Sequence, residues 1–324
     1  NCAPLLVLPA FLLVFHLPLM KGFYSFSLAF ALLPWMWYLF SSASLHWKSL
    51  FAKWIIALLL FLAHPFVFVF GAALVCIRDL IRVGLKQLDR RTAQLGFFMH
   101  TLILLPLWGW LWSFNAQQVH HPFRFFFNRA FITQYFLRFH SFAGYHPYEY
   151  YPALLAAFLF LSGFFITGIT RIRAGVRLQE EDTFLFMLVL CGVVYIFFPD
   201  YFLIGLLELR MQCLIYLFMF MYTAQQLETP VFMKLYSFGA WILFLILCGI
   251  RLPSFYSHGR QISSMMRLAH RIPDERYVLA LCFNHHGADE ERGNESLPVF
   301  IHAHQYMGTQ RALFFPDNYE AHTT

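Results

Sequence analysis

The stretch "WIIALLLFLAHPFVFVFGAALVCI", residues 54–77, decides the class of this protein. It contains no Asp, Glu, Lys or Arg and lies between Lys53 and Arg78. A helix needs about 20 apolar residues to cross the ~30 Å hydrocarbon core of a bilayer, at a rise of about 1.5 Å per residue. We therefore expect residues 51–77 to form one membrane-spanning helix.

Apolar runs of this kind recur along the chain. Hydrophobic residues make up 60% of the sequence and charged residues 12%, whereas soluble proteins carry about 25% charged residues. We expect membrane helices at roughly 3–20, 22–40, 51–77, 95–114, 151–170, 184–198, 204–224 and 235–252. The 41 Phe and 8 Trp residues suit lipid-facing helices with aromatic belts at the membrane surfaces. These features predict an all-α polytopic membrane protein with about eight transmembrane helices in residues 1–252.

The distribution of Lys and Arg predicts the orientation, because cytoplasmic loops carry an excess of both. One set of alternate loops contains Lys21, Arg78, Arg82, Lys86, Arg90, Arg91, Arg171, Arg173, Arg177 and Lys234. The other set is poorer and contains Lys48, Lys53, Arg124, Arg129 and Arg138. The first set is therefore predicted to be cytoplasmic. The N-terminus, the loop 115–150, the Pro199–Asp200 turn and the C-terminal region then face outward. An outward N-terminus without a signal sequence leads us to expect an internal stretch of a longer protein.

Two segments outside the apolar runs predict contact with lipid. The stretch "RDLIRVGLKQLDRR", residues 78–91, is basic and amphipathic and is expected to anchor to anionic lipid on the cytoplasmic side. In the outer loop 115–150, Arg124, Arg129 and Arg138 alternate with aromatic residues in "HHPFRFFFNRAFITQYFLRFHSF". A helix of this composition would lie in the interface and bind headgroup phosphates. The alternative is a hydrophobic loop that packs over the helix bundle, and both interpretations can hold.

The sequence changes character after Leu252. Residues 253–324 are polar and predict helices at 260–271 and 298–308 and strands at 276–284 and 311–315. We expect a small α/β extracytoplasmic region, too short to bury a large core alone, that leans on the membrane helices.

Three charged residues interrupt the apolar stretch "FFPDYFLIGLLELRMQ", residues 197–212: Asp200, Glu208 and Arg210. A charge at the centre of a bilayer costs about 2.5 to 3.5 kcal/mol, so such residues are retained for a reason. A segment that re-enters the membrane around Gly205 would place Glu208 and Arg210 along an outward-facing cleft. Arg210 would suit a phosphate group there. The alternative is an internal ion pair that fixes the position of the helix.

Three stretches carry a resemblance to a known family: "PDYFLIGLLELR" (199–210), "GFYSFSLAFAL" (22–32) and "IHAHQYMGTQRALFFPDNYEA" (301–321). Together they resemble segments of multi-pass GT-C-type glycosyltransferases, and more narrowly a group of uncharacterised bacterial membrane proteins with that fold. The resemblance implies sugar transfer from a polyprenyl-phosphate donor on the outer face of the bacterial inner (cytoplasmic) membrane. It also implies that Arg210, with Glu208 and Asp200, holds the lipid phosphate.

The family's catalytic acid usually lies in the first outward loop, before the point where this sequence starts, so no catalytic residue is identified. This chain also has one glycine where the family has a cluster, and Glu-Leu-Arg where the family has Glu-Arg-Leu. These departures favour an alternative function, a non-catalytic structural or accessory subunit of a larger membrane complex.

Other chemistry is weakly indicated. The 15 His residues form no HExxH or similar spacing and the 6 Cys residues form no paired motif, so we predict no metal site. We expect no resident cofactor, unless a divalent metal accompanies a lipid-phosphate donor. The formal charge of +6 lies in short loops and does not predict binding of nucleic acid. Membrane lipids, a polyprenyl-phosphate sugar and other membrane subunits are the expected partners.

Overall fold

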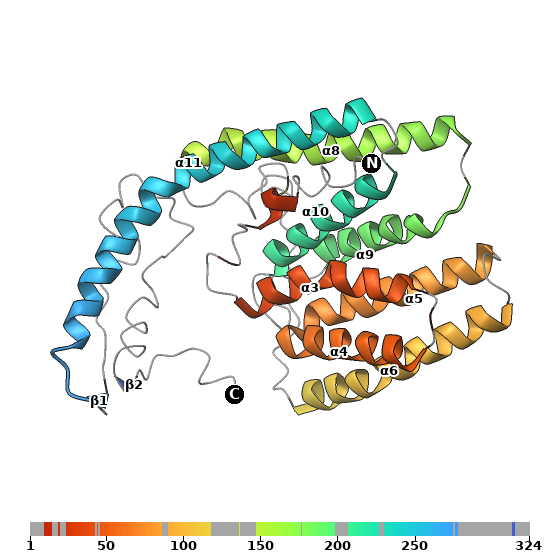
Figure 1. Cartoon of the computed structure of the whole chain (residues 1–324), viewed down its shortest axis with the longest axis horizontal. Coiled ribbons are helices and arrows are strands. Elements are labelled where there is room, and N and C mark those ends of the chain that lie inside the picture. Colours follow the sequence, from red (N-terminus) through yellow and green to blue (C-terminus); the bar gives the residue numbers. More distant parts are fainter. Residues whose placement is uncertain are drawn as a thin grey trace.

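The computed structural model describes residues 10–14, 19, 24–42, 44, 46–85, 90–117, 136, 147–175, 177–197, 207–226, 230–274, 276–277 and 313–314. These residues form a helical protein, as the composition predicts (Figure 1). The α-helices are α3 (Tyr24–Ser41), α4 (Trp47–Ala63), α5 (Pro65–Leu85), α6 (Arg90–Gln117), α8 (Tyr150–Arg173), α9 (Thr183–Phe197), α10 (Leu207–Gln226) and α11 (Pro230–Ala269). Short 3-10 helices occupy η2 (Phe11–Leu13), η3 (Pro147–Glu149) and η4 (Glu180–Asp182).

The apolar run at 51–77 is a helical hairpin, so the prediction of one membrane-spanning helix there is wrong. The chain reverses at His64, whose extended backbone (φ −161, ψ 104) separates α4 from α5. The His64 N–H donates to the Leu60 carbonyl at 2.9 Å, and the His64 carbonyl accepts from the Phe68 N–H at 3.1 Å. The following Pro65 explains the break: proline disfavours a helical residue before it but is well placed as the first residue of a helix.

The hairpin packs closely against α3. At Gly71 of α5, an added Cβ atom would lie 2.8 Å from Leu60 Cδ2 of α4 and 2.8 Å from Met36 Sδ of α3. A larger residue at this position would require the Leu60 and Met36 side chains to shift. The helix α5 therefore lies against both α3 and α4.

The hairpin changes which connections lie together. Arg82 of α5 donates to the Ser41 carbonyl at 2.8 Å, and Lys53 of α4 donates to the Ser42 carbonyl at 2.8 Å. The end of α3, the start of α4 and the end of α5 thus meet at one end of the bundle, which we call the basic end. Figure 1 shows that α6, α9 and α11 begin at this end and that α8 and α10 finish there. Its described cations are Lys48, Lys53, Arg78, Arg82, Arg91, Arg171, Arg173, Arg177 and Lys234.

The assignment of Lys48 and Lys53 to the outward set is therefore corrected. Both belong to the same end as Arg78 and Arg82, because 51–77 turns back instead of crossing. With Lys48 and Lys53 added to the basic end, the difference in positive charge between the two ends of the bundle is larger than the sequence predicts.

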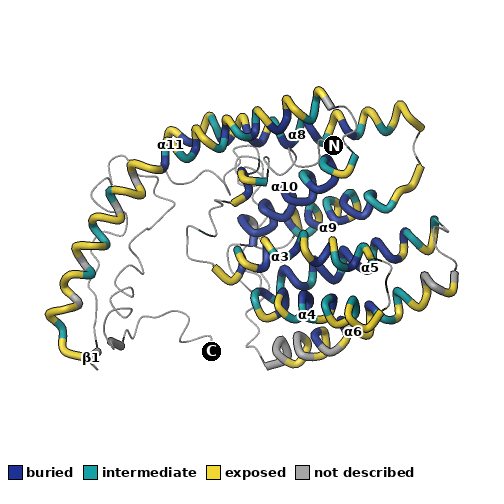
Figure 2. Tube along the Cα trace, in the orientation of Figure 1, coloured by how far each residue is buried: buried dark blue, intermediate teal, exposed yellow. Residues whose placement is uncertain are grey.

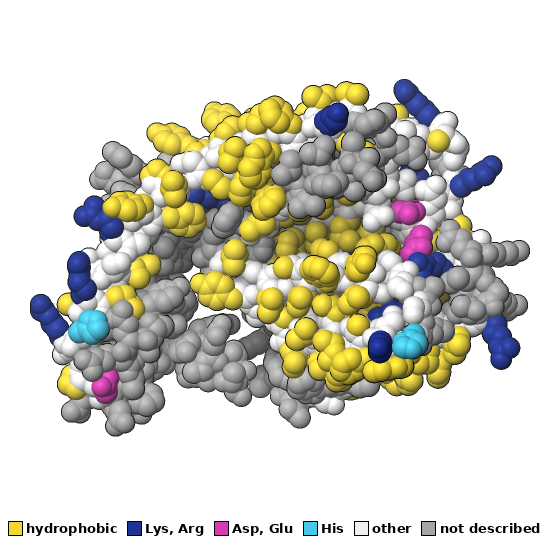
Figure 3. All heavy atoms as spheres, in the orientation of Figure 1, with side chains coloured by type: hydrophobic (Ala, Val, Ile, Leu, Met, Phe, Trp, Pro, Cys, Tyr) yellow, Lys and Arg dark blue, Asp and Glu magenta, His cyan; other side chains and the backbone are white. Residues whose placement is uncertain are grey.

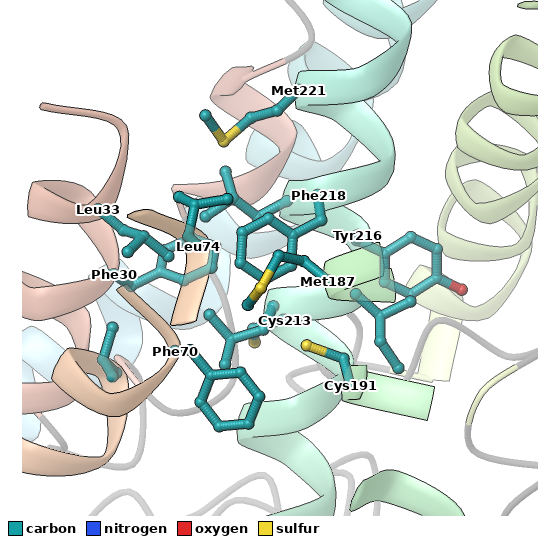
Figure 4. Packing of buried hydrophobic residues seen from close by; sticks show 14 of the residues in the cluster. Phe30, Leu33, Phe70, Leu74, Met187, Cys191, Cys213, Tyr216, Phe218 and Met221 are labelled. Carbon is teal, nitrogen blue, oxygen red and sulfur yellow. The ribbon is translucent and has the colours of Figure 1, made fainter. Parts of the chain in front are cut away.

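The core is centred on α10. Residues Leu209 to Met219 of this helix are all buried, and α8 and α9 pack against it (Figure 2). A helix with apolar residues on every side is expected in the interior. Figure 4 shows how the neighbouring helices meet it: Phe30 and Leu33 of α3, Phe70 and Leu74 of α5, and Met187 and Cys191 of α9 surround Cys213 and Phe218.

The surface of the bundle is also strongly apolar. Large side chains such as Phe158, Val189 and Phe238 are exposed, and hydrophobic atoms cover much of the face seen in Figure 3. Among the described helices, Tyr150–Arg173 and Val231–Leu268 have the length and the apolar composition needed to cross a membrane. The predicted total of about eight membrane helices remains a prediction.

The C-terminal region is described only in part. Helix α11 continues through Leu252 and Pro253 to Ala269 without a break at the predicted boundary (Figure 1). Strands β1 (Arg276–Tyr277) and β2 (Leu313–Phe314) pair in parallel, with Arg276 opposite Leu313. Both strands fall inside the two predicted strand ranges, and the predicted helix at 298–308 lies outside the described residues.

Candidate functional site

The predicted site residues are only partly visible. Arg210 lies in the first turn of α10, and Glu208 belongs to the same turn, although its side chain is not among those described. Asp200, Gly205, Arg124, Arg129 and Arg138 lie outside the described residues. The proposed cleft and the proposed interfacial helix are therefore predictions that the described part of the chain leaves open.

One residue of the outer loop is described, and it packs into the bundle. The ring of Phe136 stacks on Tyr216 of α10 with centroids 5.4 Å apart, and the Tyr216 hydroxyl donates to the Phe136 carbonyl at 3.0 Å. At this position the loop 115–150 therefore follows the second interpretation, a hydrophobic segment packed over the helices.

Arg210 lies inside the protein, at the end of the bundle opposite to the basic end. Its side chain is 5% exposed, and its guanidinium carbon lies 5.7 Å from the ring centre of Phe26 in α3. Phe26 in turn meets the His64 ring edge to face, with centroids 5.5 Å apart. We call Arg210, Phe26 and His64 the Arg210 cluster. It joins the start of α3, the α4–α5 turn and the start of α10.

The Arg210 cluster places a buried cation and a buried imidazole on one aromatic ring. Burial, and then the positive charge of Arg210, lower the pKa of His64 to about 3, so that the imidazole is neutral. The buried Nδ1 atom of His64 has no hydrogen-bond partner among the described residues. A cation over an aromatic face beside a neutral imidazole can bind a phosphate, because the guanidinium stays charged and the imidazole can donate.

Sequence reasoning missed the role of Phe26 and His64. Phe26 lies within the "GFYSFSLAFAL" motif, but nothing in the motif connects it to Arg210. His64 lies inside the apolar run 51–77, and its spacing to other polar residues does not connect it with Arg210. The His-Pro dipeptide was the available signal, since it marks a place where a helix tends to break.

A second polar group lies at the basic end and crosses three helices. Lys53 Nζ of α4 lies 3.1 Å from His100 Nε2 of α6, and His100 Nδ1 lies 2.6 Å from Asp79 Oδ2 of α5. Arg78 donates to the other oxygen of Asp79 at 2.7 Å. Lys53 and Arg78 are completely buried. We call these four residues the Lys53–Arg78 network.

The Lys53–Arg78 network continues to the start of α9. Glu180 pairs with Arg82 at 2.7 Å and lies 3.8 Å from Arg78. The prediction that residues 78–91 anchor to lipid is thus wrong for Arg78 and Arg82. Their charges are compensated inside the protein by Asp79 and Glu180, because the hairpin turns this face of α5 toward its neighbours.

Two further ion pairs hold α8. Near the basic end, Arg171 pairs with Asp182 and also donates to the Tyr222 hydroxyl at 3.2 Å and the Arg177 carbonyl at 2.7 Å. At the opposite end, Arg251 of α11 makes a bidentate pair with Glu149, at 2.9 and 3.0 Å. Removal of one member of such a buried pair is strongly destabilising, because it leaves the other charge buried without a partner.

These networks differ in what they can do. In the Lys53–Arg78 network, buried cations meet acceptors of this chain, which is what a group that fixes helix positions requires. In the Arg210 cluster, the described contacts of the cation include the face of the Phe26 ring, which in turn meets His64. Among the residues that the structure describes, no group of three or more His, Cys, Asp or Glu side chains could hold a metal ion.

Comparisons with protein-family models, with curated proteins and with solved structures found no match to this chain.

Proposed function

We propose that this protein is a multi-pass membrane protein that binds the phosphate of a polyprenyl-phosphate-linked sugar at the Arg210 cluster. In this proposal it is a GT-C-like glycosyltransferase of the bacterial inner membrane. The single observation that carries the binding step is the buried guanidinium of Arg210, stacked on Phe26 beside a neutral His64. The sugar transfer itself rests on the resemblance of the three sequence stretches.

The orientation in the membrane is supported by charge and by aromatic residues. The basic end carries the cations that membrane proteins keep in the cytoplasm. By their positions in the helices, exposed aromatic side chains lie near both ends of the bundle: Trp35, Tyr38 and Trp47 near the basic end, and Tyr24, Trp112, Tyr148 and Tyr151 near the other. Such belts mark the two membrane surfaces. Helix α8 runs about 30 Å from Tyr151 to Arg171 at 1.5 Å per residue, the thickness of a hydrocarbon core.

This orientation places the Arg210 cluster near the extracytoplasmic surface, where a polyprenyl-phosphate donor would present its phosphate. The C-terminal region then also lies on that side. A polyprenyl tail would remain in the bilayer beside the apolar surface of the bundle, while the phosphate reaches the buried cation. Arg210 would act on the donor as a binding group, and the catalytic acid stays unassigned.

The test is a comparison of polyprenyl phosphate with the uncharged polyprenol, using the purified chain in detergent. We expect Arg210→Gln to bind polyprenyl phosphate about tenfold to a hundredfold more weakly, because a hydrogen bond to a charged group contributes about 1.5 to 3 kcal/mol. Binding of polyprenol should not change. Arg251→Gln together with Glu149→Gln is the matched control, since it removes a buried arginine at the same end along with the acid that neutralises it. Equal binding of the phosphate and the alcohol by the unaltered protein would show that Arg210 is no phosphate site.

One observation favours the alternative, a non-catalytic subunit of a larger membrane complex. Arg210 is 5% exposed and packs against Phe26, as expected for an arginine that fixes helix positions. This alternative predicts that the chain co-purifies with other membrane subunits in constant ratio. It also predicts that polyprenyl phosphate and polyprenol bind equally weakly, and that Arg210→Gln lowers stability alone.

A further inference from the structure

Four buried hydroxyl groups lie on α8, α10 and α11 near the basic end, where α10 finishes and α11 begins (Figure 1). They belong to Thr167 of α8, Thr223 in the last turn of α10, and Tyr236 and Ser237 in the second turn of α11. All four residues are at most 3% exposed. The hydroxyl oxygen of each has no hydrogen-bond partner among the residues that the structure describes. We call these four residues the hydroxyl cluster.

Gly163 of α8 brings two of these side chains together. The position that a Cβ atom would take at Gly163 lies 3.2 Å from Thr223 Cγ2 and 3.3 Å from Tyr236 Cζ, the carbon that bears the hydroxyl group. Thr167 follows Gly163 by one turn on the same face of α8, because residues four positions apart lie above one another on a helix. Ser237 directly follows Tyr236 in the chain. Side chains of three helices therefore border one region of the interface.

This region holds most of the buried polar atoms whose bonding the described chain does not explain. Among the described residues, seven buried side-chain nitrogen and oxygen atoms have no hydrogen-bond partner, and four of the seven belong to the hydroxyl cluster. A hydroxyl group that is buried without a partner is unfavourable, so nearly all buried polar groups in proteins are hydrogen-bonded. Four such groups at one helix junction therefore indicate a guest that bonds to them.

We propose that the hydroxyl cluster binds water, and that a water molecule bridges Tyr236 of α11 to Thr223 of α10 and Thr167 of α8. The chemistry of the lining selects this guest. Each hydroxyl group can donate and accept a hydrogen bond, as water can. None of the four side chains carries a charge that would compensate an ion. A buried water usually makes two to four hydrogen bonds, which is the number that these hydroxyl groups can supply.

The bound water would fasten the start of α11 to the bundle. Near the opposite end of the bundle, Arg251 of α11 is already fixed by its bidentate pair with Glu149. The outer face of α11 is apolar and exposed near its start, at Val231, Leu235 and Phe238. In apolar surroundings the polar groups of a helix depend on neighbouring helices and on ordered water for their hydrogen bonds. Helix α11 would thus be held by an ion pair at one end and by water-mediated bonds at the other. The inference does not depend on the proposed function.

Substitutions that remove only a hydroxyl group test the proposal by the sign of their effect on denaturant unfolding of the full chain in detergent. If water bonds to the cluster, Tyr236→Phe and Thr223→Val should each raise the unfolding equilibrium constant about fivefold, since one hydrogen bond contributes about 1 kcal/mol. Removal of an unpartnered hydroxyl group should instead leave stability unchanged or increase it. Thr170→Val is the matched control: this exposed threonine of α8 already donates to the Ile166 carbonyl at 2.8 Å, and its loss should change the constant by about twofold at most.

The double variant shows whether the two hydroxyl groups share a guest. Independent effects would multiply to about 25-fold, whereas a shared water gives a smaller change, because loss of either hydroxyl group already weakens the same bridge. Water is detected directly by solid-state NMR of the full chain in lipid vesicles, as transfer of magnetisation from water to the labelled Tyr236 ring. Tyr216 is the control ring, since its hydroxyl group donates directly to the Phe136 carbonyl at 3.0 Å. We expect clear transfer to Tyr236 and weaker transfer to Tyr216.

Three results would overturn the proposal. The first is a Tyr236→Phe variant at least as stable as the unaltered protein, and the second is the absence of magnetisation transfer from water to Tyr236. Either would show that α8, α10 and α11 pack around hydroxyl groups that are dry. The third is additivity of Tyr236→Phe and Thr223→Val, which would show that no single water joins α11 to α10.

Discussion

The substitution Asp79→Asn tests the Lys53–Arg78 network most directly. Asp79 accepts from Arg78 with one carboxylate oxygen and from His100 Nδ1 with the other. Asparagine keeps the volume and one oxygen, but it has no charge and places an NH₂ group where the second acceptor was. His100 must then accept at Nδ1 and carry its proton on Nε2, where it faces the Lys53 ammonium group at 3.1 Å. The change therefore spreads from α5 through α6 to α4.

The cost can be worked out from these contacts. Loss of one partner of a buried ion pair destabilises a protein by about 3 to 5 kcal/mol. Glu180 lies 3.8 Å from Arg78, and the asparagine oxygen can still accept from Arg78, so part of the compensation remains. We expect a loss of about 3 kcal/mol in the free energy of unfolding, the lower end of that range. Lys53→Met should partly rescue the variant, because methionine removes the donor that faces His100.

The assay is denaturant unfolding of the purified protein in detergent micelles, followed by circular dichroism. Asp79→Asn, Lys53→Met and the double variant form a cycle, and we expect a favourable coupling of at least about 1 kcal/mol. Glu181→Gln is the control, a partly exposed acid in the neighbouring connection that should change stability by about 0.5 kcal/mol or less. A loss below about 1 kcal/mol in Asp79→Asn, or additivity of the two variants, would show that the network does not fix the helices.

Two further predictions concern the hairpin. Single cysteines at Lys48→Cys and Arg91→Cys, in a background without other reactive cysteines, should be labelled by an impermeant reagent from the same side of the membrane, and Tyr148→Cys from the other. If positions 48 and 91 were labelled from opposite sides, residues 51–77 would form one membrane-spanning helix and the hairpin would be wrong. Gly71→Ala should destabilise the protein by about 1 to 3 kcal/mol, because its Cβ atom meets Leu60 and Met36 at 2.8 Å. Gly84→Ala on the same helix has open space and should stabilise it by roughly 0.5 to 1 kcal/mol; equal effects would show that the packing at Gly71 is looser than described.

The sequence predicted the helices well where an apolar run ends in polar residues. The ranges 22–40, 95–114, 151–170, 184–198 and 204–224 each fall on one helix. The run at 51–77 failed because its turn is a single residue. Apolar composition on both sides of His64 hides the break, and a proline is compatible with the first turn of a helix as well as with a kink.

That one error also hid the Lys53–Arg78 network. With a single span, Lys53 and Arg78 would lie on opposite sides of the membrane. With a turn at His64, residues at similar distances before and after it become neighbours, and Lys53 and Arg78 lie 11 and 14 positions from the turn. At 1.5 Å per residue these positions differ in depth by about 5 Å, so the two cations fall in one layer of the bundle.

The Arg210 cluster shows a different limit of sequence reasoning. The cost of a charge in an apolar run draws attention to Arg210, and the structure buries this residue. Its contact with Phe26, and that of Phe26 with His64, could not be predicted, because they join residues far apart in the sequence and depend on how α3, the α4–α5 turn and α10 pack. A single sequence carries no periodicity that relates positions across such distances.

The Lys53–Arg78 network and the Arg210 cluster lie at opposite ends of the bundle, so substitutions can test them separately. This makes it possible to decide whether Arg210 binds a phosphate or only holds helices. Cations of the Lys53–Arg78 network meet Asp79 and Glu180 of the same chain, so substitutions there should change unfolding and leave ligand binding alone. Arg210 is buried against Phe26 and close to a neutral His64, and replacement of an arginine that serves only to hold helices should lower stability without changing the affinity for a ligand. Arg210→Met therefore divides the two proposals. A variant as stable as the unaltered protein that has lost polyprenyl phosphate supports the binding site. A variant that is equally stable and still binds polyprenyl phosphate excludes it, and a destabilised variant with unchanged affinity supports the accessory subunit.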